Sequence, residues 1–152
     1  MTELPRTVPA GPLQETPPEG YETYFTRGGF APYVGPVFRK LGGEGGNHTY
    51  LFTPRTHHMN AGGAVHGGMM MTLADMTMGG SVRTLLEAAP SGTISLNCDF
   101  VGPGREGSPV TIVTEVTRRT RTIVFMQATI TQDGRTLMTA SGIWKVLGEK
   151  PA

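Results

Sequence analysis

The chain has 152 residues, carries 13 Lys and Arg against 12 Asp and Glu, and contains a single cysteine, Cys98. The length fits one domain. The near-neutral charge excludes a broad basic surface for duplex nucleic acid, and one cysteine excludes a disulfide framework or a cysteine-based zinc site. No apolar run approaches the ~20 residues that span a bilayer, and the N-terminus lacks the apolar core of a secretory signal. We therefore expect a soluble, cytoplasmic protein that binds neither nucleic acid nor membrane.

The ends of the chain differ from its middle. Residues 1–20 contain five prolines and no apolar periodicity, which predicts a disordered arm. Residues 148–152 form a short polar tail, so one folded domain is predicted at residues 21–147. At its start, residues 21–34 carry five aromatic side chains around two adjacent glycines. That pattern leaves a short helix and an aromatic plug packed on the domain as open alternatives.

Two strand patterns and one helix pattern come next. Residues 35–41 and 48–54 are predicted to be strands, joined by the flexible sequence GGEGG. Residues 65–88 contain no proline and are rich in Met, Leu and Ala, which predicts a helix about 36 Å long. The centre of this helix is apolar nearly all round, so we expect it to be buried on most sides.

Four further strands are predicted after the helix, at residues 93–101, 109–119, 121–132 and 135–147. Between the last two, Asp133-Gly134 is the signature of a two-residue hairpin. The first of the four alternates in polarity, which places two sets of residues on opposite faces: Ile94, Leu96, Cys98 and Phe100 on one, and Thr93, Ser95, Asn97 and Asp99 on the other.

A fold class follows from this order of elements. A helix that is apolar nearly all round needs other elements packed around it. One antiparallel sheet curled about one helix satisfies that need, so we predict an α+β fold. The remaining sheet edges and apolar face then call for partner subunits.

A polar, glycine-rich loop at residues 58–68 leads directly into the long helix. The first turn of a helix has free N–H groups and the positive end of the helix dipole. Gly67 and Gly68 carry no side chain, so a substrate oxygen can approach their N–H groups closely. This arrangement predicts a site for an anion, or for the oxyanion that forms when an ester or thioester carbonyl is attacked.

Asp75 is a carboxylate in an apolar stretch of the same helix. A charge in such surroundings needs a partner or a function, which makes Asp75 a candidate general base or nucleophile. His66 lies nine residues earlier, and at about 100° per residue the two side chains face opposite sides of the helix. If both residues act, a neighbouring subunit must complete the site of Asp75.

The combined pattern resembles the hotdog-fold acyl-CoA thioesterases, in particular the branch related to phenylacetate degradation. The matching residues follow the family's spacing without gaps: Asn60, Gly63, His66-Gly67-Gly68 and Leu73-Ala74-Asp75. The resemblance covers about residues 35–147 and implies a hotdog fold that hydrolyses an acyl-CoA thioester to the free acid and CoA. Because a thioester is already activated, no metal or other cofactor is expected. The implied assembly is a homodimer or homotetramer with active sites shared between subunits.

The resemblance also implies a role for individual positions. The N–H of Gly67 polarises the thioester carbonyl, Asn60 holds the thioester or positions the water, and His66 supports substrate placement. Asp75 of the opposite subunit is the nucleophile or the general base. Thr93, eighteen residues after it, orients the attacking water.

The resemblance further implies a CoA-binding segment. Gly68 is expected to help bind the substrate, and CoA phosphates are expected to meet a basic residue at a hairpin, where this chain has Arg118, Arg119 and Arg121. The glycine that precedes the basic residue in the family is Thr120 here.

Two other functions stay open, namely an acyl-thioester hydratase or dehydratase and a non-catalytic acyl-CoA-binding module. The first usually pairs a histidine with a carboxylate in one site, which the opposite faces of His66 and Asp75 disfavour. The second gains nothing from a charge in an apolar helix. The adjacent pair His57-His58 is disfavoured as a metal site because neighbouring side chains point apart. The sequence leaves the acyl group open.

Overall fold

The computed structural model describes residues 16–24, 29–43 and 47–149. The greater part of the predicted N-terminal arm and the end of the tail lie outside these residues. The strands are β1 (Glu22–Tyr24), β2 (Val37–Leu41), β3 (His48–Phe52), β4 (Ser91–Phe100), β5 (Val110–Arg119), β6 (Ile123–Gln132) and β7 (Arg135–Val146). The helices are α1 (Ala31–Val34), the 3-10 helix η1 (Thr56–His58) and α2 (Gly67–Leu85).

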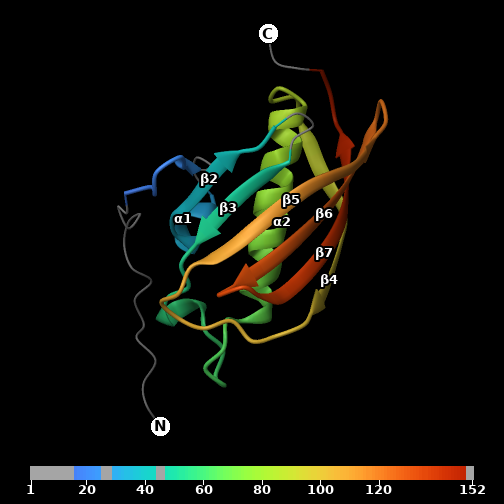
Figure 1. The fold of residues 1–152 in the computed structure, drawn as a ribbon. Helices are drawn as coiled ribbons and strands as arrows, with labels where there is room; N and C mark the ends of the chain where they lie inside the picture. Colours follow the sequence, from blue (N-terminus) through green and yellow to red (C-terminus); the bar gives the residue numbers. More distant parts are fainter. Residues whose placement is uncertain (1–15, 25–28, 44–46, 150–152) are drawn as a thin grey trace.

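One antiparallel sheet contains all seven of these strands, in the order β1-β2-β3-β5-β6-β7-β4. The sheet wraps around α2, which runs through the middle of the molecule with β1 and β2 to one side and β4 to the other (Figure 1). The predicted α+β fold is therefore confirmed. Asp133 and Gly134 both have positive φ, 50° and 75°, as the predicted two-residue hairpin between β6 and β7 requires.

The long helix α2 is shorter at both ends than predicted. Val65 forms an isolated bridge with Met59, and His66 caps the helix, so the first helical residue is Gly67. At the other end the last helical residue is Leu85, because Glu87 and Ala88 have positive φ of 50° and 68° and cannot continue the helix.

The sheet covers only one side of α2. The side chains on that side are buried, among them Leu73, Ala74 and Met78, and pack against the inner face of the sheet. Met71 and Asp75 lie on the other side, which this chain leaves partly open. The expectation that the helix is buried on most sides holds for its centre, where every residue from 73 to 82 is buried or half-buried, but not for its two ends. None of the described helices is long and apolar enough to cross a membrane.

A β-bulge changes the faces of β4. Thr93 pairs with Trp144 of β7, but Ser95 pairs with Ile143, so Ile94 is an extra residue in the ladder. The bulge places Thr93 on the helix side of the sheet, whereas simple alternation grouped it with Ser95 on the opposite face. That expectation is wrong for Thr93. Its place on the helix side lets its side chain reach Asp75 of α2.

Residues 21–34 contain both a strand and a helix. β1 pairs with β2, and the short helix α1 follows after an undescribed gap. The predicted alternatives included the helix but not β1. Its three residues are too few to show a period, and they form a strand because β2 offers them an edge to pair with.

Candidate active site

At the N-terminus of α2, the N–H group of Gly67 has no hydrogen-bond partner among the described residues. His66 is the capping residue, and its Nδ1 accepts a hydrogen bond of 2.9 Å from the N–H of Gly68. The N–H of Gly68 is thus already occupied by its own chain, which leaves that of Gly67 as the more accessible donor. A Cβ placed on Gly67 would lie 3.3 Å from the ring of Phe100, so this donor opens beside the end of β4.

Asn60 organises the loop that leads into the helix. Its Oδ1 accepts hydrogen bonds from the backbone N–H groups of Gly62, at 2.9 Å, and Ala64, at 3.1 Å. The backbone of Asn60 closes the loop further through a bond from its N–H to the carbonyl of Ala64. The side chain is exposed, and its Nδ2 donates to none of the described residues. Asn60 therefore holds the loop with its oxygen and offers its amide nitrogen outward.

Asp75 and Thr93 meet across the interface between α2 and β4. The hydroxyl of Thr93 donates a hydrogen bond of 2.8 Å to Oδ1 of Asp75. The other carboxylate oxygen, Oδ2, accepts no hydrogen bond within the described residues. The bulge at Ile94 is what brings Thr93 to this side. The pair leaves one orientated carboxylate oxygen available to a water molecule or to a substrate carbon.

The two halves of the expected site do not meet within one chain. Asp75 follows Gly67 by eight residues, which places it about 12 Å along the helix axis and about 80° around it. Asn60, His66 and Gly67 therefore lie at one end of α2, while Asp75 and Thr93 lie halfway along its open side. One chain brings together the members of each half but not the two halves.

A pocket of about 360 Å³ lies beside Asp75 on the open side of α2. The sheet curls so far that both its edges contribute, with Tyr24 from β1 and Thr93 from β4. The complete lining is Tyr24, Asp75, Met76, Gly79, Gly80, Arg83, Ala89, Pro90, Ser91, Thr93 and Trp144. Sequence reasoning missed Tyr24 and Trp144, because neither belongs to a motif. Trp144 carried a signal as the chain's one tryptophan, but Tyr24 carried none that separated it from its aromatic neighbours.

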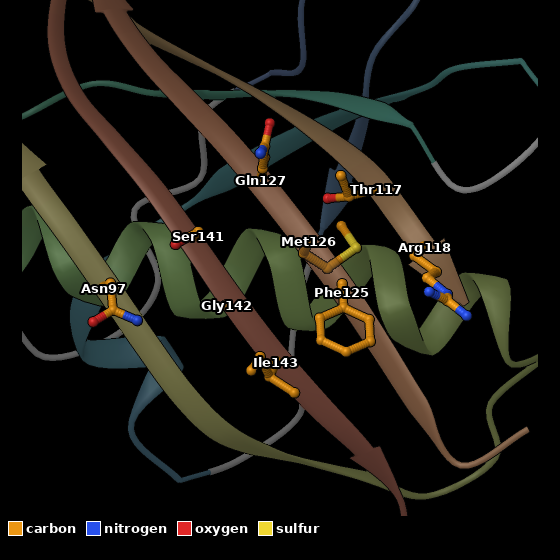
Figure 2. Close-up of a pocket in the computed structure, with 9 residues that line it drawn as sticks. All are labelled: Asn97, Thr117, Arg118, Phe125, Met126, Gln127, Ser141, Gly142 and Ile143. Atoms are coloured by element: carbon orange, nitrogen blue, oxygen red, sulfur yellow. The ribbon is translucent and has the colours of Figure 1, made fainter. Parts of the chain in front are cut away.

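A second bulge, at Thr117, decides which arginine of the predicted basic cluster faces the helix. Arg118 pairs with Phe125 and lies on the outer face, at the rim of a groove of about 430 Å³, where Figure 2 shows it with Thr117 and Phe125 in front of the sheet and α2 behind. Arg119 lies on the helix side and donates a long hydrogen bond of 3.5 Å to the carbonyl of Leu85.

Arg119 and Arg121 line a pocket of about 290 Å³ at the C-terminal end of α2. This pocket and the pocket of Asp75 share Ala89 as a lining residue, so the two adjoin. The structure therefore places two of the three arginines near the candidate reaction centre and the third, Arg118, away from it.

Of the two adjacent histidines, His58 is buried and held by hydrogen bonds to backbone groups. Its Nδ1 accepts from the N–H of Arg55 at 2.9 Å, and its Nε2 is bonded to the carbonyl of Val34 at 2.8 Å. Burial, and secondarily the neighbouring His57, lower the pKa of His58 from 6.5 to about 4. Both ring nitrogens of His58 are thus engaged by backbone groups. In the parts of the chain that the structure describes, no three His, Cys, Asp or Glu side chains are grouped as metal ligands would be.

The fold and this arrangement define a hotdog thioesterase: one antiparallel sheet around a central helix, with a carboxylate on the helix and a glycine-rich helix N-terminus. Residues 62–139 match the thioesterase superfamily. The chain belongs to this superfamily and is a thioester hydrolase, as the sequence predicted.

Curated relatives agree with this assignment. A Pseudomonas aeruginosa protein named as a candidate esterase is 29% identical over 128 residues, which cover 84% of this chain and 95% of that protein. Human acyl-coenzyme A thioesterase 13 is 26% identical over 85 residues, which cover 56% of this chain and 61% of that protein.

Solved structures show the same fold. A Streptococcus pneumoniae protein described as a hypothetical thioesterase, solved with coenzyme A, has a TM-score of 0.66 at 23% identity, and the match covers 88% of this chain and 93% of that one. A phenylacetic acid degradation-related protein of Ralstonia eutropha has a TM-score of 0.67 at 24% identity, with coverages of 71% and 83%. At these identities the neighbours confirm the predicted hotdog fold.

Proposed function

We propose that this protein hydrolyses acyl-CoA thioesters to the free acid and CoA. The observation that carries the proposal is the hydrogen bond from Thr93 to Asp75, which orients a carboxylate beside a pocket on the open side of α2. A human relative named as an acyl-coenzyme A thioesterase and a fold neighbour solved with coenzyme A support CoA as the thiol part of the substrate.

The chemistry divides between the two halves of the site. The thioester carbonyl oxygen accepts a hydrogen bond from the N–H of Gly67, and the positive end of the helix dipole stabilises the negative charge that develops there. Asn60 donates from Nδ2 to hold the thioester or the water, and His66 fixes the first turn by capping Gly68.

Asp75 supplies the attacking electrons, either by taking a proton from water or by attacking the carbonyl carbon itself. In the first route the water oxygen bonds to the carbonyl carbon, and Asp75 keeps the proton until the C–S bond breaks and the CoA thiolate receives it. In the second, a carboxylate oxygen of Asp75 bonds to the carbonyl carbon as the C–S bond breaks and CoA leaves as the thiolate. Water then hydrolyses the mixed anhydride, which releases the free acid, regenerates the carboxylate and supplies the proton that the thiolate takes up. Thr93 orients Asp75 in both routes through its hydrogen bond to Oδ1.

The site is completed by a second copy of the chain, in a dimer or a tetramer built from such dimers. β4 is an edge strand with exposed apolar residues, and Asp75 lies on the open side of the helix next to it. Two antiparallel α2 helices related by a two-fold axis bring each Gly67 to the partner's Asp75. Ile94 and Phe100, 57% and 55% exposed, are then buried by the partner.

The CoA phosphates bind at Arg119 and Arg121. These two guanidinium groups line one pocket that adjoins the pocket of Asp75, and arginine binds phosphate oxygens through paired N–H donors. Arg118, on the outer face, lies apart from this path.

Release of free CoA from an acyl-CoA panel tests the proposal, with hydration of an enoyl-CoA measured in parallel. Wild-type protein should release CoA, and Asp75→Asn should lower kcat on the order of 10²–10⁴-fold while circular dichroism stays unchanged. The exposed Asp99→Asn, on neighbouring β4, is the matched control and should keep full activity. Hydration without CoA release, or wild-type turnover by Asp75→Asn, would refute the assignment.

A further inference from the structure

The pocket beside Asp75 continues along α2 towards its C-terminus over two consecutive glycines. Gly79 and Gly80 line the pocket, and helix geometry places them about 6 and 7.5 Å along the axis from Asp75. Neither residue has a side chain, which lets the far wall of the pocket approach the helix closely. That wall is formed by Trp144 and Tyr24.

Trp144 brings an indole N–H donor to this pocket. The residue is only 2% exposed, and Nε1 of its indole lies 3.4 Å from the position that a Cβ on Gly79 would take. Within the described residues this N–H has no hydrogen-bond partner. An indole N–H can only donate, and Nε2 of His48 is the one fully buried side-chain nitrogen or oxygen without a partner among the described residues, so the N–H of Trp144 keeps some accessible surface in the pocket. An acceptor atom in the pocket can therefore reach this donor.

Tyr24 supplies a second donor from the opposite edge of the sheet. Its hydroxyl lies 2.5 Å from the position of a Cβ on Gly80 and bonds to none of the described residues. The guanidinium of Arg39 lies 4.9 Å from the centre of the Tyr24 ring, and Tyr50 packs edge-on at 5.7 Å. Burial raises the pKa of Tyr24, so its hydroxyl keeps the proton that it donates. The ring is therefore held in place with its donor facing the pocket.

We propose that the indole N–H of Trp144 and the hydroxyl of Tyr24 bind an oxygen on the acyl group, so that the preferred substrates carry a keto, hydroxyl or ether oxygen. The inference rests on the proposed function and names its substrate class. A chain extends about 1.2 Å per bond, so an oxygen five or six carbons from the thioester reaches the depth of Gly79 and Gly80. The amide carbonyls of the CoA arm are the competing source of acceptor oxygens.

Two acyl groups of equal shape separate acceptor chemistry from size. The ketone 5-oxohexanoyl-CoA should be hydrolysed with about tenfold higher kcat/KM than 5-methylenehexanoyl-CoA, in which a carbon replaces the keto oxygen. Tyr24→Phe should lower kcat/KM for the ketone about 5- to 10-fold and leave the alkene within twofold. Tyr33→Phe, at a tyrosine that is 63% exposed, is the matched control and should change neither.

Ethanethiol esters of the same two acids identify which part of the substrate is bound. They lack the CoA amides, so the preference for the ketone and its loss in Tyr24→Phe should persist. If Tyr24→Phe impairs both CoA esters equally but neither ethanethiol ester, the donors bind the CoA arm and the proposal is wrong. If Tyr24→Phe slows hydrolysis of all four substrates equally, Tyr24 serves packing alone, and the proposal is also wrong.

A binding measurement keeps this inference separate from catalysis. Trp144 is the one tryptophan of the chain, so its fluorescence reports this pocket alone. Non-hydrolysable analogues, with a methylene group between the sulfur and the carbonyl, should bind about tenfold tighter when they carry the keto oxygen and should shift the emission of Trp144. If wild-type protein hydrolyses neither ester, the proposed function fails, but this binding difference still decides the inference. Equal affinities and an unchanged emission would overturn it.

Discussion

Two inactive variants of this chain should restore each other's activity when their subunits exchange. Asp75→Asn removes the carboxylate half of the site, and Asn60→Ala removes the half at the helix N-terminus. Because the helix places Gly67 about 12 Å and about 80° away from Asp75, each half must be supplied by a different chain. A hybrid dimer then has both lesions in one site and none in the other.

The size of the recovery follows from this geometry. Random exchange of equal amounts makes about half of the dimers hybrid, and each hybrid has one intact site of two, so about a quarter of wild-type CoA release should return. The control mixes wild-type protein with the double variant Asn60→Ala/Asp75→Asn. There every hybrid site carries one lesion, so exchange should lower the activity of the mixture from about one half to about a quarter of that of wild type.

Both outcomes are read against direct evidence of exchange, such as hybrid dimers in native mass spectrometry. If hybrids form but the two inactive variants stay inactive, while the control mixture keeps half of the activity, both residues act within one chain. The shared-site reasoning would then be refuted.

Three further results are expected. Thr93→Val should lower kcat about tenfold with little change in KM, because it removes the hydrogen bond to Asp75, and Thr93→Ser should retain most of the activity in the same steady-state assay. Arg121→Ala should raise KM about tenfold for acyl-CoA but not for an ethanethiol ester, whereas Arg118→Ala should change neither; equal effects on both esters would contradict phosphate binding. The pKa of His58 lies near 4 when folded and 6.5 when unfolded, so the unfolded chain binds the extra proton between these values. The free energy of unfolding in urea should therefore fall by up to about 3 kcal/mol as pH is lowered from 6.5 to 4, and an unchanged free energy would contradict a buried, neutral His58.

The order of elements could be read from the sequence because long, strongly periodic segments dominate it. The helix, the strands that flank it and the Asp133-Gly134 hairpin each carry a local signal that the structure obeys. β1 could not be predicted, because a three-residue strand forms only where an existing edge pairs with it.

The sequence could not show which residues of β4 and β5 face the helix, and the reason is the same for both strands. A bulge adds a residue to one strand, and every alternation beyond it is displaced. The bulge at Ile94 turns Thr93 to the helix and so creates its bond to Asp75, and the bulge at Thr117 sends Arg118 outward and Arg119 inward. The sequence identified these residues, but only the pairing of the strands shows which of them lie together.

Two of the residues that line the pocket of Asp75 lie outside the segment that matches the superfamily. Residues 62–139 hold Gly67, Asp75 and Thr93, whereas Tyr24 precedes that segment and Trp144 follows it. On our proposal, the two donors that select the acyl group are thus encoded outside the segment that holds the proposed catalytic groups. Substitutions at Tyr24 and Trp144 should then change the preferred acyl group without altering Gly67, Asp75 or Thr93, and relatives with the same central segment need not share a substrate.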